Sequence, residues 1–316
     1  MIDWKKINEY FFSELNAREK AFALADEGTF TELLGPRDRF SSPHLKTLGT
    51  AIEFDDGTVT GVGLLDKHIA FIVSMEGKFI GGAIGEVNGA KFVAVLRLAL
   101  KTYEKLGADE LASRRPIVII SFDTGGVRLH EANAGLLAHA EVMDAIQDLR
   151  RKVPVAAVIG GKVGCFGGMG FVAASSDAVI MSDIGRLGLT GPEVIEQEVG
   201  AEEFDASDKS LIYRTTGGRH KFITGDCNFL VADKAPAFRE ALKKTADMPM
   251  EEIEDMRRNG SAELVQKQID FAEEVVDSGI SDSIGLWEKY GNKEAEKLPE
   301  KSLDVFLETV RRRPLD

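Results

Sequence analysis

Hydrophobic positions along this chain follow two patterns, continuous runs and a helical spacing, which alternate through its middle. Continuously apolar runs predict buried strands at residues 116–122, 153–159 and 178–181. Between residues 90 and 105, apolar residues instead recur at the spacing of one face of a helix. Strands that alternate with helices are typical of α/β proteins. The pattern therefore predicts one α/β domain.

Before the first of these runs, the sequence predicts a helix, a loop and a hairpin. Residues 1–27 have helical character, and Asn16 stands where it can cap the helix that follows. Residues 28–50 hold several Gly and Pro breakers, which predict a loop. Within residues 51–75, two apolar segments flank Asp66-Lys67, and this arrangement predicts a β-hairpin.

The C-terminal part of the chain is charged and helical. Residues 227–231 predict a short strand, and a charged helical part follows from about residue 234. Residues 250–316 are rich in Glu, Lys and Asp, with scattered apolar residues. No long linker rich in Ser, Gly or Pro divides the chain. We therefore predict one domain over residues 1–240 and a helical extension over residues 241–316 that packs on the domain or on a partner.

The most informative local feature is a strand that runs into a glycine-rich turn at the start of a helix. It occurs twice, around Gly125-Gly126 and around Phe166-Gly167-Gly168, and further glycine turns lie at Gly81-Gly82 and Gly191-Pro192. A glycine turn that opens a helix leaves backbone N–H groups free, and the helix dipole adds positive partial charge. Two such turns side by side predict a site for oxygens that develop negative charge, as in thioester enolates.

Composition and motifs exclude several classes of function. The chain has 316 residues and a formal net charge of −13, which argues against nonspecific binding to nucleic acid or to a membrane surface. No apolar run approaches the roughly 20 residues of a membrane helix, and no signal peptide is visible, so we expect a cytoplasmic protein. The sequence has no phosphate-binding loop, dinucleotide-fold or serine–histidine–acid pattern. Its two cysteines are too few for a zinc ribbon, and no metal site is predicted.

Three side chains near the turns have two interpretations each. Cys165 stands at a helix start, where the dipole lowers a thiol pKa, so it is either a nucleophile or a small buried side chain. Arg128 either binds a carboxylate substrate or forms an ion pair with Asp123 or Glu131. His130 either moves protons near the site or lies at the surface.

The glycine motifs resemble those of the carboxyltransferase branch of the crotonase-like enzymes. The resemblance covers residues 17–235 and is carried by segments 26–33, 79–91, 123–133, 164–169 and 191–198. The form Cys-Phe-Gly-Gly-Met at residues 165–169 is most similar to malonate decarboxylase β subunits. The zinc ribbon of the bacterial acetyl-CoA carboxylase β subunit is absent, and the sequence beyond residue 235 has no counterpart in the resemblance.

This resemblance implies a crotonase-like fold of repeated β-β-α units with extra C-terminal helices. It implies the activity of a malonate decarboxylase β subunit, which decarboxylates malonyl-S-acyl carrier protein to acetyl-S-acyl carrier protein. The active site would lie at an interface with a homologous γ-type subunit. The thioester would sit on a dephospho-CoA-derived prosthetic group of the acyl carrier protein. No cofactor would be bound covalently to this chain, and biotin-dependent and biotin-independent systems both fit.

Enolate chemistry assigns roles to the turns. We expect the catalytic oxyanion hole at Gly125, Gly126, Phe166, Gly167 and Gly168. Substrate-binding residues are expected at the neighbouring motif positions Gly81, Gly82, Val127, Arg128, Cys165, Met169, Gly191 and Pro192. Two alternatives stay open: a biotin-dependent acyl-CoA carboxyltransferase subunit, and a non-catalytic scaffold whose partner holds the chemistry.

Overall fold

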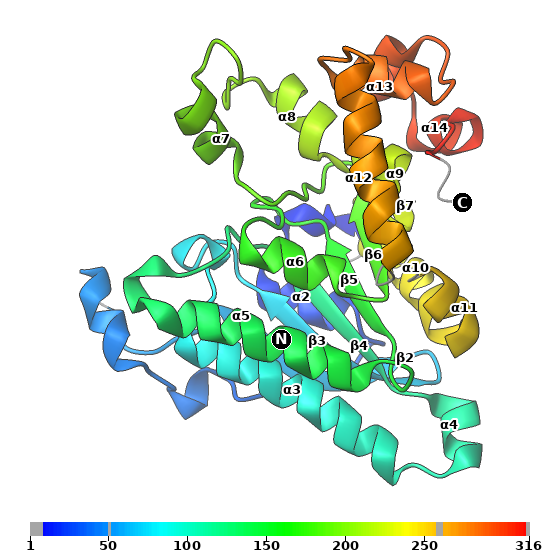
Figure 1. Cartoon of the computed structure of the whole chain (residues 1–316). Coiled ribbons are helices and arrows are strands. Elements are labelled where there is room, and N and C mark those ends of the chain that lie inside the picture. The colour runs from blue at the N-terminus through cyan, green and yellow to red at the C-terminus, as the bar shows by residue number, and fades with distance from the viewer. Residues whose placement is uncertain (1–8, 50–51, 257–261, 314–316) are drawn as a thin grey trace.

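The computed structural model describes residues 9–49, 52–256 and 262–313, which form helices on both faces of one sheet (Figure 1). Within these residues the sheet has seven strands in chain order. They are β1 (Thr31–Leu33), β2 (Thr58–Leu65), β3 (His68–Met75), β4 (Ile117–Phe122), β5 (Val155–Ile159), β6 (Ala178–Ser182) and β7 (Phe229–Val231). The pairings β1–β2 and β2–β3 are antiparallel, and those from β3 to β7 are parallel.

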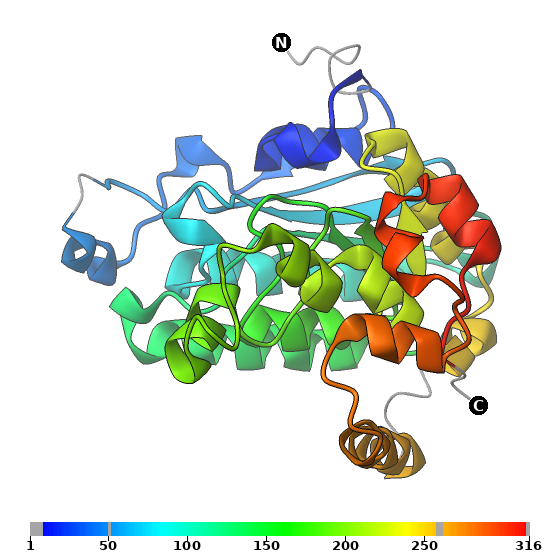
Figure 2. The same cartoon turned by 90° about the horizontal axis from the view of Figure 1, so that it is seen from above.

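Each face of the sheet has its own layer of helices, as Figure 2 shows. One layer holds α2 (Ala17–Ala23) and α10 (Ala235–Asp247), and the other holds α3 (Glu86–Lys105), α5 (Asn133–Leu149) and α6 (Gly168–Ala174). Alternate residues of β4 join different cores, because Ile119 packs with the first layer and Ile120 with the second. A strand that is buried on both faces needs no polar positions, which explains the continuous apolar runs. The predicted α/β architecture is confirmed.

The predicted hairpin is also confirmed. Strands β2 and β3 pair from Thr58–Met75 down to Leu65–His68, so Asp66 and Lys67 form the turn. Asp66 has a φ of 56°, a left-handed conformation that Asp tolerates better than most residues. The three strands predicted at residues 116–122, 153–159 and 178–181 appear as β4, β5 and β6.

Two boundaries and one loop differ from the sequence prediction. The helix expected from residue 90 begins at Glu86, where the Asn88 side chain accepts a hydrogen bond from the Gly85 N–H at 2.6 Å. Helix α5 begins only at Asn133, so a short 3-10 helix, η5 (Leu129–Glu131), separates it from the first glycine turn. Only the second glycine turn opens a helix directly. The loop expected at residues 28–50 contains β1 and two 3-10 helices, η2 (Pro36–Asp38) and η3 (Pro43–Leu48).

Of the helix expected over residues 1–27, residues 1–8 lie outside the described part of the chain. The remainder forms a 3-10 helix, η1 (Phe12–Glu14), and α2. Asn16 caps α2 as predicted: its side chain accepts a hydrogen bond from the Glu19 N–H at 2.9 Å, and the Glu19 carboxylate accepts one from the Asn16 N–H at 3.0 Å.

The remaining helices follow the sheet strands and close the C-terminal end. They are η4 (Ile80–Gly82), α4 (Ala108–Arg114), α7 (Pro192–Val199), α8 (Lys209–Thr216), α9 (Gly218–Thr224), α11 (Met250–Met256), α12 (Ala262–Asp277), α13 (Ser283–Lys289), η7 (Ala295–Glu300) and α14 (Leu303–Thr309). Within the described residues, none of the helices is both long and apolar enough to cross a membrane.

The C-terminal helices are attached to the core rather than separate from it. Trp287 and Phe306 are buried in the same apolar cluster as α3 and α5. The Trp287 indole N–H donates to Nδ1 of His220 at 3.2 Å, and burial lowers the pKa of His220 to about 4. The boundary between residues 240 and 241 falls inside α10, and the division into two domains remains a prediction.

Candidate active site

The two glycine turns lie against each other at the carboxyl ends of the neighbouring parallel strands β4 and β5. Gly126 and Gly167 both have positive φ, of 114° and 63°. A methyl group added at Gly126 would lie 3.2 Å from the Cα atom of Gly167, and one added at Gly167 would lie 3.1 Å from that of Gly126. Side chains at either position would push the turns apart, so glycine is required for this contact. The carboxyl ends of parallel strands are where α/β proteins bind ligands.

The other glycine motifs brace these turns from both sides. The Gly125 N–H donates to the Gly81 carbonyl oxygen at 2.9 Å, and a methyl group on Gly82 would lie 1.9 Å from the Asp123 carbonyl oxygen. On the other side, the Gly167 N–H donates to the Leu189 carbonyl oxygen at 2.9 Å. Gly191 and Pro192 lie just beyond this loop and start α7, as predicted.

Internal hydrogen bonds decide which turn amides remain available to a ligand. The N–H groups of Gly125 and Gly167 already donate to the Gly81 and Leu189 carbonyl oxygens. The Gly126 N–H donates to Thr124 Oγ1 at 3.0 Å, and the Phe166 N–H donates to the Thr124 carbonyl oxygen at 3.0 Å.

The backbone N–H groups of Val127 and Gly168, the residues that follow the two touching glycines, remain available to a ligand. These N–H groups have no hydrogen-bond acceptor within the part of the chain that the structure describes. Gly168 is the first residue of α6, where the backbone donors of a helix lack internal partners. Among the residues predicted to form the oxyanion hole, only Gly168 therefore keeps an available N–H. Val127, predicted as a substrate-binding residue, supplies the second.

Asp123 holds the turns in place from behind. Its carboxylate accepts a hydrogen bond from the Lys20 ammonium group at 2.8 Å and another from the Val163 N–H at 2.8 Å. Lys20 is 1% exposed, so this ion pair lies inside the protein. Sequence reasoning missed Lys20 because it comes from a distant helix and carries no local motif.

Arg128 points into the protein interior. Its guanidinium group donates to Asp55 at 2.6 Å, to Glu131 at 3.2 Å and to the Ala83 carbonyl oxygen at 2.9 Å, and its side chain has no exposed surface. The expected ion pair with Glu131 is therefore present, whereas Asp55 takes the place expected for Asp123. In the single chain, Arg128 has no exposed surface with which to contact a substrate.

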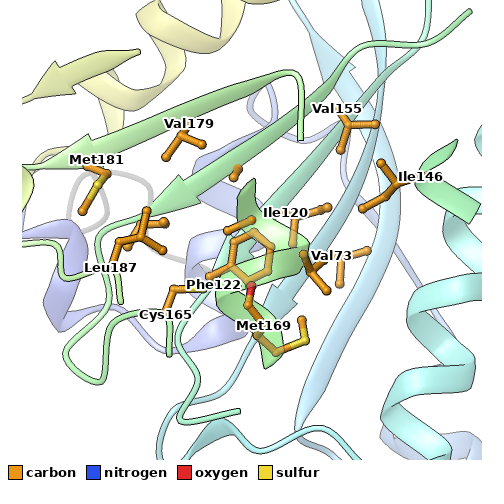
Figure 3. Close-up of a cluster of buried hydrophobic side chains, with 14 of the residues drawn as sticks. Val73, Ile120, Phe122, Ile146, Val155, Cys165, Met169, Val179, Met181 and Leu187 are labelled. Carbon is orange, nitrogen blue, oxygen red and sulfur yellow. Dashed lines mark hydrogen bonds between the residues drawn. The ribbon is translucent and has the colours of Figure 1, made fainter. Parts of the chain in front are cut away.

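Cys165 and Met169 belong to the apolar core beneath the turns, beside Phe122 and Ile120 (Figure 3). The Cys165 thiol donates to the Met169 carbonyl oxygen at 3.3 Å. Burial, together with the nearby charge of Asp123, raises the pKa of this thiol well above its usual range. A buried neutral thiol is a poor nucleophile, so the geometry favours the small buried side chain over the nucleophile.

Replacing Cys165 with alanine is accordingly expected to leave turnover within about twofold of the original and to cost about 1 kcal/mol of stability. The measurement is steady-state turnover beside a thermal melt. Cys227→Ala is the matched control, because Cys227 is also buried and burial raises its thiol pKa to about 12. A large loss of turnover in the Cys165 variant alone, with folding intact, would indicate that Cys165 acts as a nucleophile.

Large apolar side chains are exposed on the elements that carry the turns. Leu129 is 80% exposed in η5, and exposed leucines and a phenylalanine follow on α5, α6 and the next loop: Leu136, Leu137, Phe171 and Leu189. His130, next to Leu129, is also exposed. Exposed apolar groups in such number are typical of protein–protein contacts. No cluster of potential metal-binding side chains occurs among the described residues.

Comparisons with known proteins place the chain in a family. The chain matches the model of the carboxyl transferase domain over residues 12–278. It is 54% identical to the malonyl-S-ACP:biotin-protein carboxyltransferase of Malonomonas rubra over 99% of both chains. It resembles a chain of the Pseudomonas malonate decarboxylase hetero-tetramer in complex with malonate, with a TM-score of 0.69, 42% identity, and coverage of 76% of this chain and 85% of that one.

A more distant similarity is to the transcarboxylase 12S core, with a TM-score of 0.61, 26% identity, and coverage of 74% of this chain but 41% of that one. Together these similarities confirm the predicted crotonase-like carboxyltransferase fold and the predicted resemblance to malonate decarboxylase. The chain therefore belongs to the carboxyl transferase family of enzymes and is similar over nearly its whole length to a carboxyltransferase that acts on malonyl-S-ACP.

Proposed function

We propose that this chain binds the malonyl thioester of an acyl carrier protein and removes its carboxyl group, with the thioester enolate held by the backbone N–H groups of Val127 and Gly168. The proposal rests on one observation about the touching turns, Thr124–Val127 and Cys165–Gly168. Of the backbone N–H groups in these turns, those of Val127 and Gly168 alone lack a hydrogen-bond acceptor within the described chain. The substrate class is supported by the 54% identical relative, whose name specifies malonyl-S-ACP.

The chemistry requires such amides. When the carboxyl group departs, the electron pair of the broken carbon–carbon bond moves onto the thioester and places negative charge on its oxygen. Catalysis needs contacts that are stronger in this transition state than with the starting thioester. Fixed N–H groups meet this need without reorganisation, and removal of one such donor typically costs about 10²–10³ in rate. The enolate carbon then takes up a proton to give the acetyl thioester.

The turns also provide an apolar wall for this step. Val127 is half-buried and can offer this apolar surface, whereas Phe166 and Met169 are buried in the single chain and support the turns from the interior. A carboxylate placed against apolar side chains loses its hydration, and charge interactions with the fixed amides strengthen in the same environment. The internally bonded residues Gly125 and Gly126 shape this site rather than donate to the substrate.

The carboxyl group has two candidate acceptors. We favour biotin on a carrier protein, because the 54% identical relative is named for transfer from malonyl-S-ACP to a biotin protein. Direct release as CO2 is the second candidate, supported by the likeness to malonate decarboxylase subunits. In both cases the enolate forms at the same turns, so the two differ in what receives the carboxyl group.

The exposed apolar side chains around the turns support the proposal that another subunit completes the site. Leu129, Leu137 and Leu189 are each at least 60% exposed in the single chain. We propose a homologous γ-type subunit as the partner that covers them, because the similar solved structures are hetero-oligomers. The dephospho-CoA-derived arm of the carrier would enter between the two subunits.

The test is consumption of malonyl-S-acyl carrier protein by this chain co-expressed with its neighbouring subunit, with and without biotinylated carrier and avidin. Conversion that needs both chains and is stopped by avidin supports transfer to biotin. Conversion that avidin does not affect moves the assignment to direct decarboxylation. Unchanged conversion after loss of the Gly168 N–H would make the chain a scaffold whose partner holds the chemistry.

A further inference from the structure

One face of helix α5 contacts both turns that carry the available amides. Gly135 packs against the first turn: a methyl group added there would lie 2.9 Å from Cγ1 of Val127 and 3.4 Å from the Arg128 nitrogen. His139, one helical turn further on, lies against the second. A methyl group added at Gly168 would lie 2.6 Å from Cδ2 and 2.7 Å from Nε2 of the His139 ring. Residues four apart share a helix face, so one rigid element supports both amides.

The orientation of the His139 ring is fixed by Gly135. Nδ1 of His139 lies 2.6 Å from the Gly135 carbonyl oxygen. A carbonyl oxygen only accepts, so Nδ1 carries the proton and, in the neutral ring, Nε2 carries the lone pair. Burial lowers the pKa of His139, which favours this neutral form. The contact with Gly135 therefore ties the ring beneath Gly168 to the residue that packs against Val127.

The second ring nitrogen has no such partner. Nε2 of His139 is buried and lacks a hydrogen-bond partner within the described chain. A buried unpaired acceptor costs about 1–3 kcal/mol, whereas an apolar side chain at this position would avoid the cost. Buried unsatisfied groups of this kind call for an explanation. The position of the ring against Gly168 supplies one, because a planar ring that is hydrogen-bonded at one edge is a better defined support than a flexible side chain.

We propose that Gly135 and His139 are positioning residues that set the spacing of the Val127 and Gly168 amides. The inference rests on the proposed function of those amides. Gly135 allows the first turn to approach α5. The His139 ring sets the distance between Gly168 and α5. Neither residue contacts the substrate. Their effect is on catalytic rate rather than on substrate affinity, because misplacing a donor weakens its contact most when the enolate charge is present.

The experiment is a double-mutant cycle on the assembled complex, with turnover of malonyl-S-acyl carrier protein as the readout. Gly168→Ala keeps the N–H but needs the space of the ring, so kcat is expected to fall about 100-fold with KM within about twofold. His139→Ala is expected to lower kcat about 10-fold. In the double variant the methyl group fits into the vacated space, and kcat is expected to exceed that of Gly168→Ala by about 10-fold.

Glu141→Ala is the control for a change on α5, because Glu141 is exposed on the opposite side of the helix. If His139→Ala fails to assemble, His139→Ser takes its place in the cycle. A double variant whose kcat falls by the product of the single effects overturns the inference, and so does full activity in Gly168→Ala. Both results leave the proposed function standing, because that is tested separately by deleting the Gly168 N–H itself.

Discussion

Replacing Arg128 with methionine is expected to lower the free energy of unfolding by about 3–5 kcal/mol. The side chains of Arg128, Asp55 and Glu131 have no exposed surface, so the change leaves two carboxylates buried without their cation. Methionine fills much of the same volume but cannot donate to the Ala83 carbonyl oxygen, which accepts from the guanidinium group at 2.9 Å. Unpaired charges inside a protein are costly because water cannot solvate them.

Urea unfolding followed by circular dichroism measures this effect. Arg114→Met is the matched control, because Arg114 is paired with Glu110 at the surface and its loss is expected to leave the unfolding midpoint unchanged. Adding Asp55→Asn and Glu131→Gln to the Arg128 variant removes the orphaned charges and is expected to restore part of the lost stability. If Arg128→Met unfolds at the same urea concentration as Arg114→Met, the buried ion pair does not hold this region together.

The sequence was sufficient for strands β2 to β7 and for the pairing of the turns, whereas β1 lies in a segment predicted to be a loop. The runs that became β4 and β5 are apolar at every position because both faces of each strand are covered. Adjacent parallel strands bring their carboxyl ends together, so the turns that follow Phe122 and Ile159 had to be neighbours. The glycines at positions 126 and 167 then indicated that the two turns approach each other closely, and the structure shows this contact.

The identity of the available amides was not predictable from local sequence. The N–H of Gly125 is used by Gly81 and that of Gly167 by Leu189, and both acceptors come from other motifs of the chain. The same holds for the Asp55 partner of Arg128, which lies 73 residues away. Helix α5 starts later than the glycine turn because η5 intervenes, so a glycine turn does not by itself mark a helix start.

The position of His139 beneath Gly168 was also not predictable from local sequence. A histidine in a helical segment carries no sequence signal that distinguishes a surface position from one beneath a catalytic turn. The role that we propose for it follows only from the contact with Gly168 on the neighbouring helix. The general rule is that sequence periodicity predicts which face of an element is buried, whereas tertiary contacts decide what that face supports.

Deleting the backbone N–H of Gly168 is expected to lower kcat about 10²–10³-fold. Incorporating glycolic acid at position 168 replaces the N–H with an ester oxygen and changes no side chain. This N–H has no acceptor within the described chain, so its removal breaks no internal hydrogen bond. The ester carbonyl at Gly167 accepts more weakly from the Gly170 N–H, so stability is expected to fall by about 0.5–1 kcal/mol. The effect on KM is expected to be small, because the carbonyl oxygen of the starting thioester attracts the amide less than the enolate oxygen does.

An ester at Gly170 is the matched control. The Gly170 N–H is bonded to the Gly167 carbonyl oxygen at 2.9 Å, so its deletion removes an internal hydrogen bond of the same helix. The control is expected to lower stability by about 1 kcal/mol and to affect kcat far less than the ester at Gly168. Equal losses of kcat in both esters would indicate that α6 is disturbed as a whole.

The most direct test is the single-turnover rate at which malonyl-S-acyl carrier protein loses its carboxyl group on the assembled complex that carries the Gly168 ester. Saturating substrate separates chemistry from binding, and gel filtration confirms that the subunits still assemble. A stabilising contact between the Gly168 N–H and the enolate predicts a rate about 10²–10³-fold below that of the unmodified complex. A rate within about threefold of the unmodified complex would contradict it, because one oxyanion-hole donor is worth far more than that.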